Sequence, residues 1–393
     1  MKLAFLCNNI SSINGVERVL TQRLSLLAES GRYEVYLITY NQYGASFSFP
    51  ISDKVHHIDL ATRYLNHCSY HGLYQYADRF LSKIKYKKSV RYCLNMIKPD
   101  IITCVDIYVA DLITVLKLNI DAVKVVECHC GLSAYFGDLE KCQSNAKQYQ
   151  KRLNQIDRII RTIRKYDKII VMTEEEKNDW GRDDKVICIP NMLDYYPDTI
   201  SNRGNIFHRV ISIGRYAYQK GYDLLLAAWL IVQQKHPDWS LHIYGSHDGD
   251  MGDFDNLKEI IEKNNLQSVC LHSATNDAYS KYCESDFYVM SSRFESFGLV
   301  LIEAMSCGLP VISFDCKYGP RSIIQEGHTG ILVSQNNVYQ MAEAICSMIE
   351  KINVRQQMAA NARIESKKYL PDNIIPFWHS FYNSLERARP NGA

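Results

Sequence analysis

The stretch that decides the fold runs from Asp286 to Asp315 and reads DFYVMSSRFESFGLVLIEAMSCGLPVISFD. Short apolar runs lie near its two ends, at Phe287–Met290 and Val311–Phe314, and such runs are typical of buried strands in a parallel sheet. The segment between them predicts a helix of about three turns over Phe297–Cys307, with Ser296 as its N-cap. The stretch therefore predicts a β-α-β unit whose helix has an open N-terminus.

The start of this helix suits a phosphate group. The amides of Phe297, Gly298 and Leu299 have no partner inside the helix, and the helix dipole is positive there. Glu303 lies six residues past Phe297, which is roughly 9 Å along the axis at about 1.5 Å per residue. A nucleoside diphosphate fits this separation, with its ribose on Glu303, and a group on its terminal phosphate then projects toward Glu295. The alternative is that both glutamates are solvated charges.

Glu295 and Glu303 are separated by seven residues, with SRFESFG around the first and EAMSCGLPVI beginning at the second. This ordered pattern resembles the signature of the group 1 retaining glycosyltransferases. The resemblance covers nearly the whole second half of the chain and, more loosely, the first half. It implies an α/β protein with the GT-B fold, in which two Rossmann-like domains, each an open parallel sheet, face a central cleft.

The chain has 393 residues, which is more than one typical domain contains. Strand and helix patterns alternate in both halves, and a polar, turn-rich segment at Tyr195–Asn205 separates them. We therefore expect an acceptor-side domain over residues 1–195 and a nucleotide-sugar-binding domain over 196–371. Residues 372–393 contain an amphipathic segment, and the resemblance implies that it crosses back onto the first domain.

The composition is that of an ordinary globular protein, with 47% hydrophobic and 22% charged residues. The net charge of +2 argues against nucleic acid as a partner. Thirteen cysteines show no zinc-site spacing and suit a reducing cytosol. We see no signal peptide and no apolar run near 18 residues, so we expect a cytoplasmic protein without a transmembrane helix.

Arg215 and Lys220 flank a loop after the first predicted strand of the second half. In the pattern G-R-x4-K-G they resemble the diphosphate-binding pair of the family, although two loop cations alone are commonly surface charges. Cations and helix amides stabilise the charge that a departing nucleoside diphosphate gains. No metal is then required. We expect no resident cofactor, and the nucleotide-sugar is a co-substrate.

In the first half, His129 ends the predicted strand from Lys124 and lies where ligands bind in open α/β sheets. The resemblance implies a role for His129 at the donor sugar and acceptor, and the alternative is a structural histidine. The resemblance also implies that the Asn14-Gly15 turn faces the diphosphate, with Gly15 at the donor. Turn chemistry accounts equally well for this pair.

Two loops of the second half have competing interpretations. His247–Asp255 reads HDGDMGDFD and contains two D-x-D motifs, Asp248-x-Asp250 and Asp253-x-Asp255. It fits no calcium-loop spacing, so we interpret it as a solvated loop rather than a metal site. The turn Gly319-Pro320-Arg321 is similar to one in family members that use uridine diphosphate sugars, but it also suits a plain turn.

A basic helix is predicted over Arg79–Met96. Its charge either forms a solvated face or contacts an anionic membrane or a lipid-linked acceptor. The charged residues are Arg79, Lys83, Lys85, Lys87, Lys88 and Arg91.

Taken with the resemblance, these patterns predict a retaining, metal-independent hexosyltransferase. It moves a sugar from a nucleotide diphosphate donor, expected to be a UDP-sugar, to a glycan or lipid-linked saccharide in cell-surface polysaccharide synthesis. We expect it in the cytoplasm, peripheral on the membrane face. Two other functions stay open, a nucleotide-sugar epimerase of the same fold and a non-catalytic nucleotide-sugar-binding protein.

Overall fold

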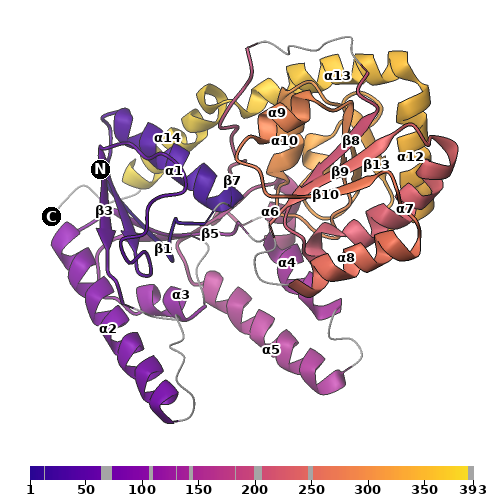
Figure 1. The fold of residues 1–393 in the computed structure, drawn as a ribbon. Helices are drawn as coiled ribbons and strands as arrows, with labels where there is room; N and C mark the ends of the chain where they lie inside the picture. The colour runs from indigo at the N-terminus through magenta and orange to yellow at the C-terminus, as the bar shows by residue number, and fades with distance from the viewer. Residues whose placement is uncertain are drawn as a thin grey trace.

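The chain forms two β-sheets in which neighbouring strands run parallel (Figure 1). This computed structural model describes residues 1–12, 14–62, 73–105, 109–129, 131–140, 145–181, 183–198, 206–246 and 251–387. A helix lies between most consecutive strands of each half, as is usual for parallel pairing, while β2 and β3 are joined by a loop. The predicted α/β class with two Rossmann-like sheets is confirmed.

The first sheet has seven strands in the order β3-β2-β1-β4-β5-β6-β7. Its central strands are buried because helices cover both faces, so their side chains are apolar on both sides. The strands are β1 (Lys2–Cys7), β2 (Glu34–Thr39), β3 (Val55–Asp59), β4 (Ile101–Val105), β5 (Val123–Glu127), β6 (Lys168–Val171) and β7 (Val186–Cys188). The helices of this half are α1 (Gly15–Glu29), α2 (Leu73–Ile97), α3 (Val109–Leu116), α4 (Gly131–Glu140), α5 (Ala146–Ile163) and α6 (Glu174–Trp180).

The second sheet has six strands in the order β10-β9-β8-β11-β12-β13. The strands are β8 (Arg209–Ile213), β9 (Ser240–Gly245), β10 (Val269–Ser273), β11 (Phe287–Met290), β12 (Val311–Phe314) and β13 (Gly330–Val333). The helices are α7 (Tyr222–Lys235), α8 (Met251–Lys263), α9 (Ala278–Cys283), α10 (Leu299–Ser306), α11 (Pro320–Ile323), α12 (Val338–Glu350), α13 (Ile352–Ser366) and α14 (Pro371–Arg387), with 3₁₀ turns at Tyr218–Lys220 and Lys367–Tyr369.

The predicted domain boundary near residue 195 falls between β7 and β8 and stays a prediction. One apolar cluster nevertheless joins the two halves. It contains Leu20 of α1, Leu301 of α10 and Trp378 of α14, all buried. The start of α10 is therefore packed between elements of both halves.

The last helix, α14, lies beside α1 in Figure 1 and contacts it. The guanidinium carbon of Arg23 lies over the ring of Trp378, 4.0 Å from the ring centroid. Tyr382 packs edge-on against Tyr33, with 5.4 Å between ring centroids. This helix therefore covers residues of the first half, where the family resemblance places it.

Within the described part of the chain, no helix is both long enough and apolar enough to cross a bilayer.

Candidate functional site

The loop between β11 and α10 brings the predicted site residues together. The helix begins at Leu299, and Gly298 is its N-cap with φ 92°, a left-handed conformation that favours glycine. The prediction that Ser296 is the N-cap is therefore wrong. Its hydroxyl instead donates to the backbone carbonyl of His129, which ties the loop to the first half. The helix therefore begins at Leu299, two residues later than the predicted start at Phe297.

Glu295 is buried, with 7% of its surface exposed, and it is paired. Lys220 Nζ lies 2.6 Å from its Oε1 atom, and the hydroxyl of Ser292 donates to the same oxygen at 2.7 Å. The structure thus places the residue predicted for the sugar against one of the two predicted for the diphosphate.

Arg215 does not take part in this ion pair. Its side chain is exposed and its Nη2 atom donates to Gln219 Oε1 at 3.4 Å. The Gln219 amide in turn donates to the carbonyl of Phe294, next to Glu295. Arg215 therefore lies at the rim of the same loop cluster, with its guanidinium accessible to solvent.

Glu303 lies in the middle of α10 with only 3% of its surface exposed. Arg18 of α1 contacts one of its carboxylate oxygens. The hydroxyl of Tyr282 donates to the other at 3.1 Å. Arg18 also lies 3.6 Å from Asp194. The predicted ribose carboxylate is thus held between the two halves of the chain.

Sequence reasoning did not identify Arg18. Arg18 lies one helical turn after Gly15 on α1, so the two residues share a face of the helix. This helical spacing could have placed Arg18 beside the site predicted at Gly15. Gly15 opens α1 and lies directly on the start of α10, since a Cβ atom there would be 2.8 Å from Leu299 Cδ1. The predicted approach of Gly15 to the phosphate end of α10 is present in the geometry, whereas its role toward a donor stays a prediction.

His129 follows β5 and is 7% exposed. Its Nε2 atom lies 2.9 Å from Glu127 Oε2, and Arg23 Nη2 lies 2.9 Å from both Glu127 oxygens. Burial alone would raise the pKa of Glu127, but Arg23 and His129 outweigh it and hold that pKa below its usual value. The carboxylate therefore fixes the orientation of the His129 ring through its Nε2 atom.

Glu176 is a second buried carboxylate beside this strand end. Its Oε1 atom accepts from the amide of Leu132 at the start of α4 and from the indole of Trp180. Among the described atoms its Oε2 has no hydrogen-bond partner. Burial raises the pKa of Glu176 to about 7. Its neighbour Gly131 has φ +63°, and a Cβ there would lie 3.1 Å from Ser296 Cβ.

The structure describes the Gly319-Pro320-Arg321 turn in full and the acidic loop His247–Asp255 only in part. Gly319 packs on the carbonyl of Phe297, since a Cβ at 319 would lie 1.7 Å from that oxygen. The Gly319-Pro320 turn therefore supports the loop before α10. In the acidic loop, Asp248 and Asp250 lie outside the described residues, and Asp253 accepts from the amide of Tyr218 at 2.8 Å. The described part of this loop thus caps a 3₁₀ turn.

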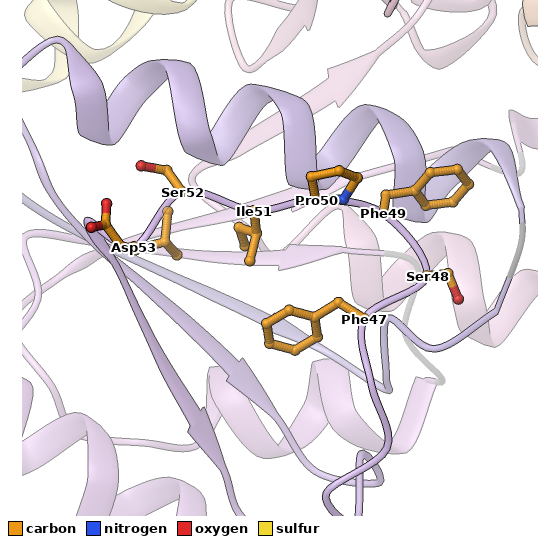
Figure 2. Close-up of a pocket in the computed structure, with 8 residues that line it drawn as sticks. Phe47, Ser48, Phe49, Pro50, Ile51, Ser52 and Asp53 are labelled. Atoms are coloured by element: carbon orange, nitrogen blue, oxygen red, sulfur yellow. The ribbon is translucent and has the colours of Figure 1, made fainter.

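A surface pocket lies elsewhere, on the loop between β2 and β3. Figure 2 shows Phe47 and Phe49 pointing away from one another along this loop, with Ser52 and Asp53 at its far end. The pocket contains none of the predicted site residues. Glu295, Glu303 and His129 are themselves buried where the two halves touch. The candidate site is therefore a closed junction in this structure.

Comparison with known proteins matches a part of the chain that includes β11, α10 and the loop between them. Residues 203–365 match the family model described as "Glycosyl transferases group 1". The chain is 31% identical over 236 residues to an uncharacterized glycosyltransferase of Haemophilus influenzae, which covers 56% of this chain and 64% of that protein. It is 28% identical over 229 residues to the poly(glycerol-phosphate) alpha-glucosyltransferase of Bacillus subtilis, covering 57% of this chain and 33% of that protein.

Among solved structures, the chain is similar to a TarM mutant of S. aureus in complex with fondaparinux, alpha-GlcNAc-glycerol and UDP. The TM-score is 0.72, with 15% identity over 97% of this chain and 99% of the other. This likeness shows a shared fold over both halves. The curated relatives are longer than the part that this chain matches, since it spans a third to about two thirds of their lengths.

Proposed function

We propose that the chain is a group 1 glycosyl transferase that moves a sugar from a UDP-sugar to a saccharide acceptor with retention at the anomeric carbon. The match of residues 203–365 to that family and the GT-B fold support this proposal. The observation that carries the proposal is the meeting of Glu295, Lys220, Glu303 and His129 around the start of α10. Two carboxylates and a cation at an open helix N-terminus match the parts of a nucleoside diphosphate sugar.

We assign the parts of the donor as follows. Glu303 accepts the ribose hydroxyls, while the amides of Gly298 and Leu299 and the Lys220 ammonium take the diphosphate. Glu295 holds the sugar, three residues before Gly298. As the glycosidic bond breaks, charge develops on the diphosphate, and fixed donors stabilise this charge without the help of a metal. Arg215 is the further cation at the rim, free to swing toward the phosphates.

The acceptor side belongs to the first half in this proposal. His129 reaches the loop before α10 through the contact between its carbonyl and Ser296. Glu127 holds one ring nitrogen, so the other can bond a sugar hydroxyl. The buried ion pair of Glu127 with Arg23 fixes this arrangement, and loss of one partner leaves an uncompensated buried charge.

Two similarities support a uridine nucleotide in the donor: a similar solved structure that contains UDP, and a turn similar to one in family members that use UDP-sugars. The related TarM structure contains UDP, and the turn at Gly319-Pro320 lies directly under the loop that precedes α10. The B. subtilis relative acts on a poly(glycerol-phosphate) by its name, which supports a polysaccharide or polyol-phosphate acceptor at the cell surface. The donor sugar itself follows from neither likeness.

Peripheral membrane contact is supported by the surface of α2. Leu81, Ile84, Tyr92 and Met96 recur at helical spacing and are exposed, whereas Tyr86, Val90 and Leu94 face the core. Lys88 lies between the exposed apolar residues. An exposed apolar stripe with basic residues suits the surface of an anionic bilayer. Figure 1 shows α2 extending from the first half.

A panel of nucleotide-sugars, with release of nucleoside diphosphate as the readout and saccharide acceptors added or withheld, tests the proposed function. We expect release from a UDP-sugar that rises when the acceptor is added. Conversion of the donor sugar without an acceptor would instead indicate an epimerase. Binding of every donor without turnover would indicate a non-catalytic binding protein.

A further inference from the structure

Three side chains of kinds that bind metals gather at the outer edge of the second sheet. His242 lies in β9, and Cys270 and His272 lie in β10. The strand register places His242 directly opposite Cys270. His272 is two residues further along β10, so it projects from the same face of the sheet. Local pairing of two strands therefore creates this cluster.

The ligand atoms of the cluster are close enough for one ion. Nδ1 of His242 lies 3.0 Å from Nε2 of His272. These two nitrogens and Cys270 Sγ all lie within 4.8 Å of one another. Around a tetrahedral zinc ion, with bonds of about 2.0–2.3 Å, ligand atoms are separated by roughly 3.3–3.8 Å. Small side-chain movements bring the three atoms to that geometry.

The rings are held in a stack. The His242 and His272 rings lie 5.1 Å apart between centroids at an angle of 14°. Tyr244 stacks on His272 at 4.3 Å. All three candidate ligands are partly exposed, so an ion can reach them from solvent. The stack limits ring rotation and reduces the entropy lost on binding.

The charges near the cluster largely balance. Arg209 of β8 and Lys281 of α9 are the cations beside the histidines. Glu284 accepts from both, at 3.3 Å from Arg209 and 3.1 Å from Lys281. Because Glu284 pairs with both Arg209 and Lys281, these two cations repel a divalent ion at the cluster less than they would if they were unpaired.

We propose that His242, Cys270 and His272 bind one divalent cation of the zinc class, with a water at the fourth position. The nitrogen and sulfur donors suit zinc, whereas magnesium and manganese prefer oxygen. Binding releases the Cys270 proton, and the proton shared by the two histidines moves to the far nitrogen of its ring. The site is separate from the sugar junction, because β8 lies between β9 and β11 in the sheet. Its effect is to tie the edge strand β10 to β9.

The test is a titration of the whole, chelator-treated chain with Co²⁺, followed by displacement with Zn²⁺. We expect one equivalent of Co²⁺ to bind with a thiolate-to-cobalt charge-transfer band and to be displaced by Zn²⁺. Cys270→Ser should abolish that band. His272→Asn should weaken binding by at least the roughly tenfold that even outer-shell changes cost.

Two matched controls separate this site from other ligands in the chain. Cys188→Ser removes a partly exposed cysteine from the first sheet, and His236→Asn removes a histidine paired with Glu350. Both should bind Co²⁺ like the unaltered chain. Circular dichroism without metal checks that each variant is folded, and His242→Asn provides a second ligand variant if one fails. Absence of the charge-transfer band in the unaltered chain, or its persistence in a folded Cys270→Ser variant, would overturn the proposal.

Discussion

The guanidinium of Arg18 lies on the carboxylate of Glu303, so a residue of the first half covers the proposed ribose site of the second. Because Glu303 is almost fully buried by this contact and by Tyr282, a ribose reaches it only when Arg18 moves away. Under the proposed assignment, the ion pair and the nucleotide compete for the same carboxylate. The proposal therefore requires the junction to open, or its side chains to exchange partners, before a donor binds.

The competition predicts that Arg18→Gln binds UDP more tightly than the unaltered chain. Removing the guanidinium frees the carboxylate, and the gain is up to about 1.4 kcal/mol, or tenfold. Calorimetric titration with UDP measures it. Arg32→Gln, an exposed arginine of the same half, is the control and should change nothing. Weaker UDP binding in Arg18→Gln would show that Arg18 contacts the nucleotide instead.

Sugar transfer should continue when divalent ions are removed. In the proposed donor complex, Lys220 and the amides at the start of α10 stabilise the leaving group without a metal. Steady-state turnover of the donor, measured before and after treatment with EDTA, is the check. Complete loss of turnover that manganese or magnesium restores would contradict this expectation. The acidic segment His247–Asp255 would then become the first candidate for a catalytic metal site.

Binding to membranes should depend on charge and on α2. Each basic residue near an anionic bilayer contributes about 1 kcal/mol, so reversing Lys88 and Arg91 together to glutamate should weaken binding by roughly tenfold or more. Cosedimentation with vesicles of anionic and neutral lipid, at rising salt, measures this. Reversal of Lys258 and Lys263 in the second half is the matched control. Equal recovery with neutral and anionic vesicles would refute membrane contact through charge.

Glu176 predicts a specific dependence of stability on pH. Burial raises its pKa from 4.5 to about 7, so between these pH values the folded state binds more protons than the unfolded state. The free energy of unfolding therefore falls as pH rises from about 4.5 to 7, by at most about 1.4 kcal/mol per pH unit, and is level above. Glu176→Gln keeps an acceptor for the Leu132 amide. Its free energy of unfolding should not fall over this pH range through residue 176, because glutamine does not titrate.

Urea unfolding at pH 5 and pH 8 measures the effect, with Trp180 beside Glu176 contributing to the fluorescence. Relative to the unaltered chain, the variant should be clearly more stable at pH 8 than it is at pH 5. Glu174→Gln, an exposed neighbour on the same helix, is the control. The same difference at both pH values would show that the carboxyl does not titrate as described.

The sequence predicted the parts of the site that lie close together along the chain. The β11-loop-α10-β12 unit follows from two apolar runs and a helix between them. The sequence also predicted that Lys220 and Glu295 lie at one site, but the ion pair between them is known only from the structure. Arg18 was missed because its contact with Glu303 joins residues 285 positions apart. Ser296 was predicted to accept from a helix amide, but its hydroxyl donates to the carbonyl of His129, which comes from the other half of the chain. The triad of His242, Cys270 and His272 depends on strand register, which residue spacing does not reveal.

The central claim, that Glu303 binds the ribose and Glu295 the sugar, is tested most directly by calorimetry of Glu303→Gln and Glu295→Gln with UDP alone. A hydrogen bond to a charged group contributes about 1.5–3 kcal/mol, so Glu303→Gln should lose roughly one to two decades of UDP affinity. Glu295→Gln should lose no UDP affinity, because its carboxylate pairs with Lys220 and not with the nucleotide, and should fail only in turnover of the full donor. Equal loss of UDP affinity in both variants, or no loss in either, would contradict the account.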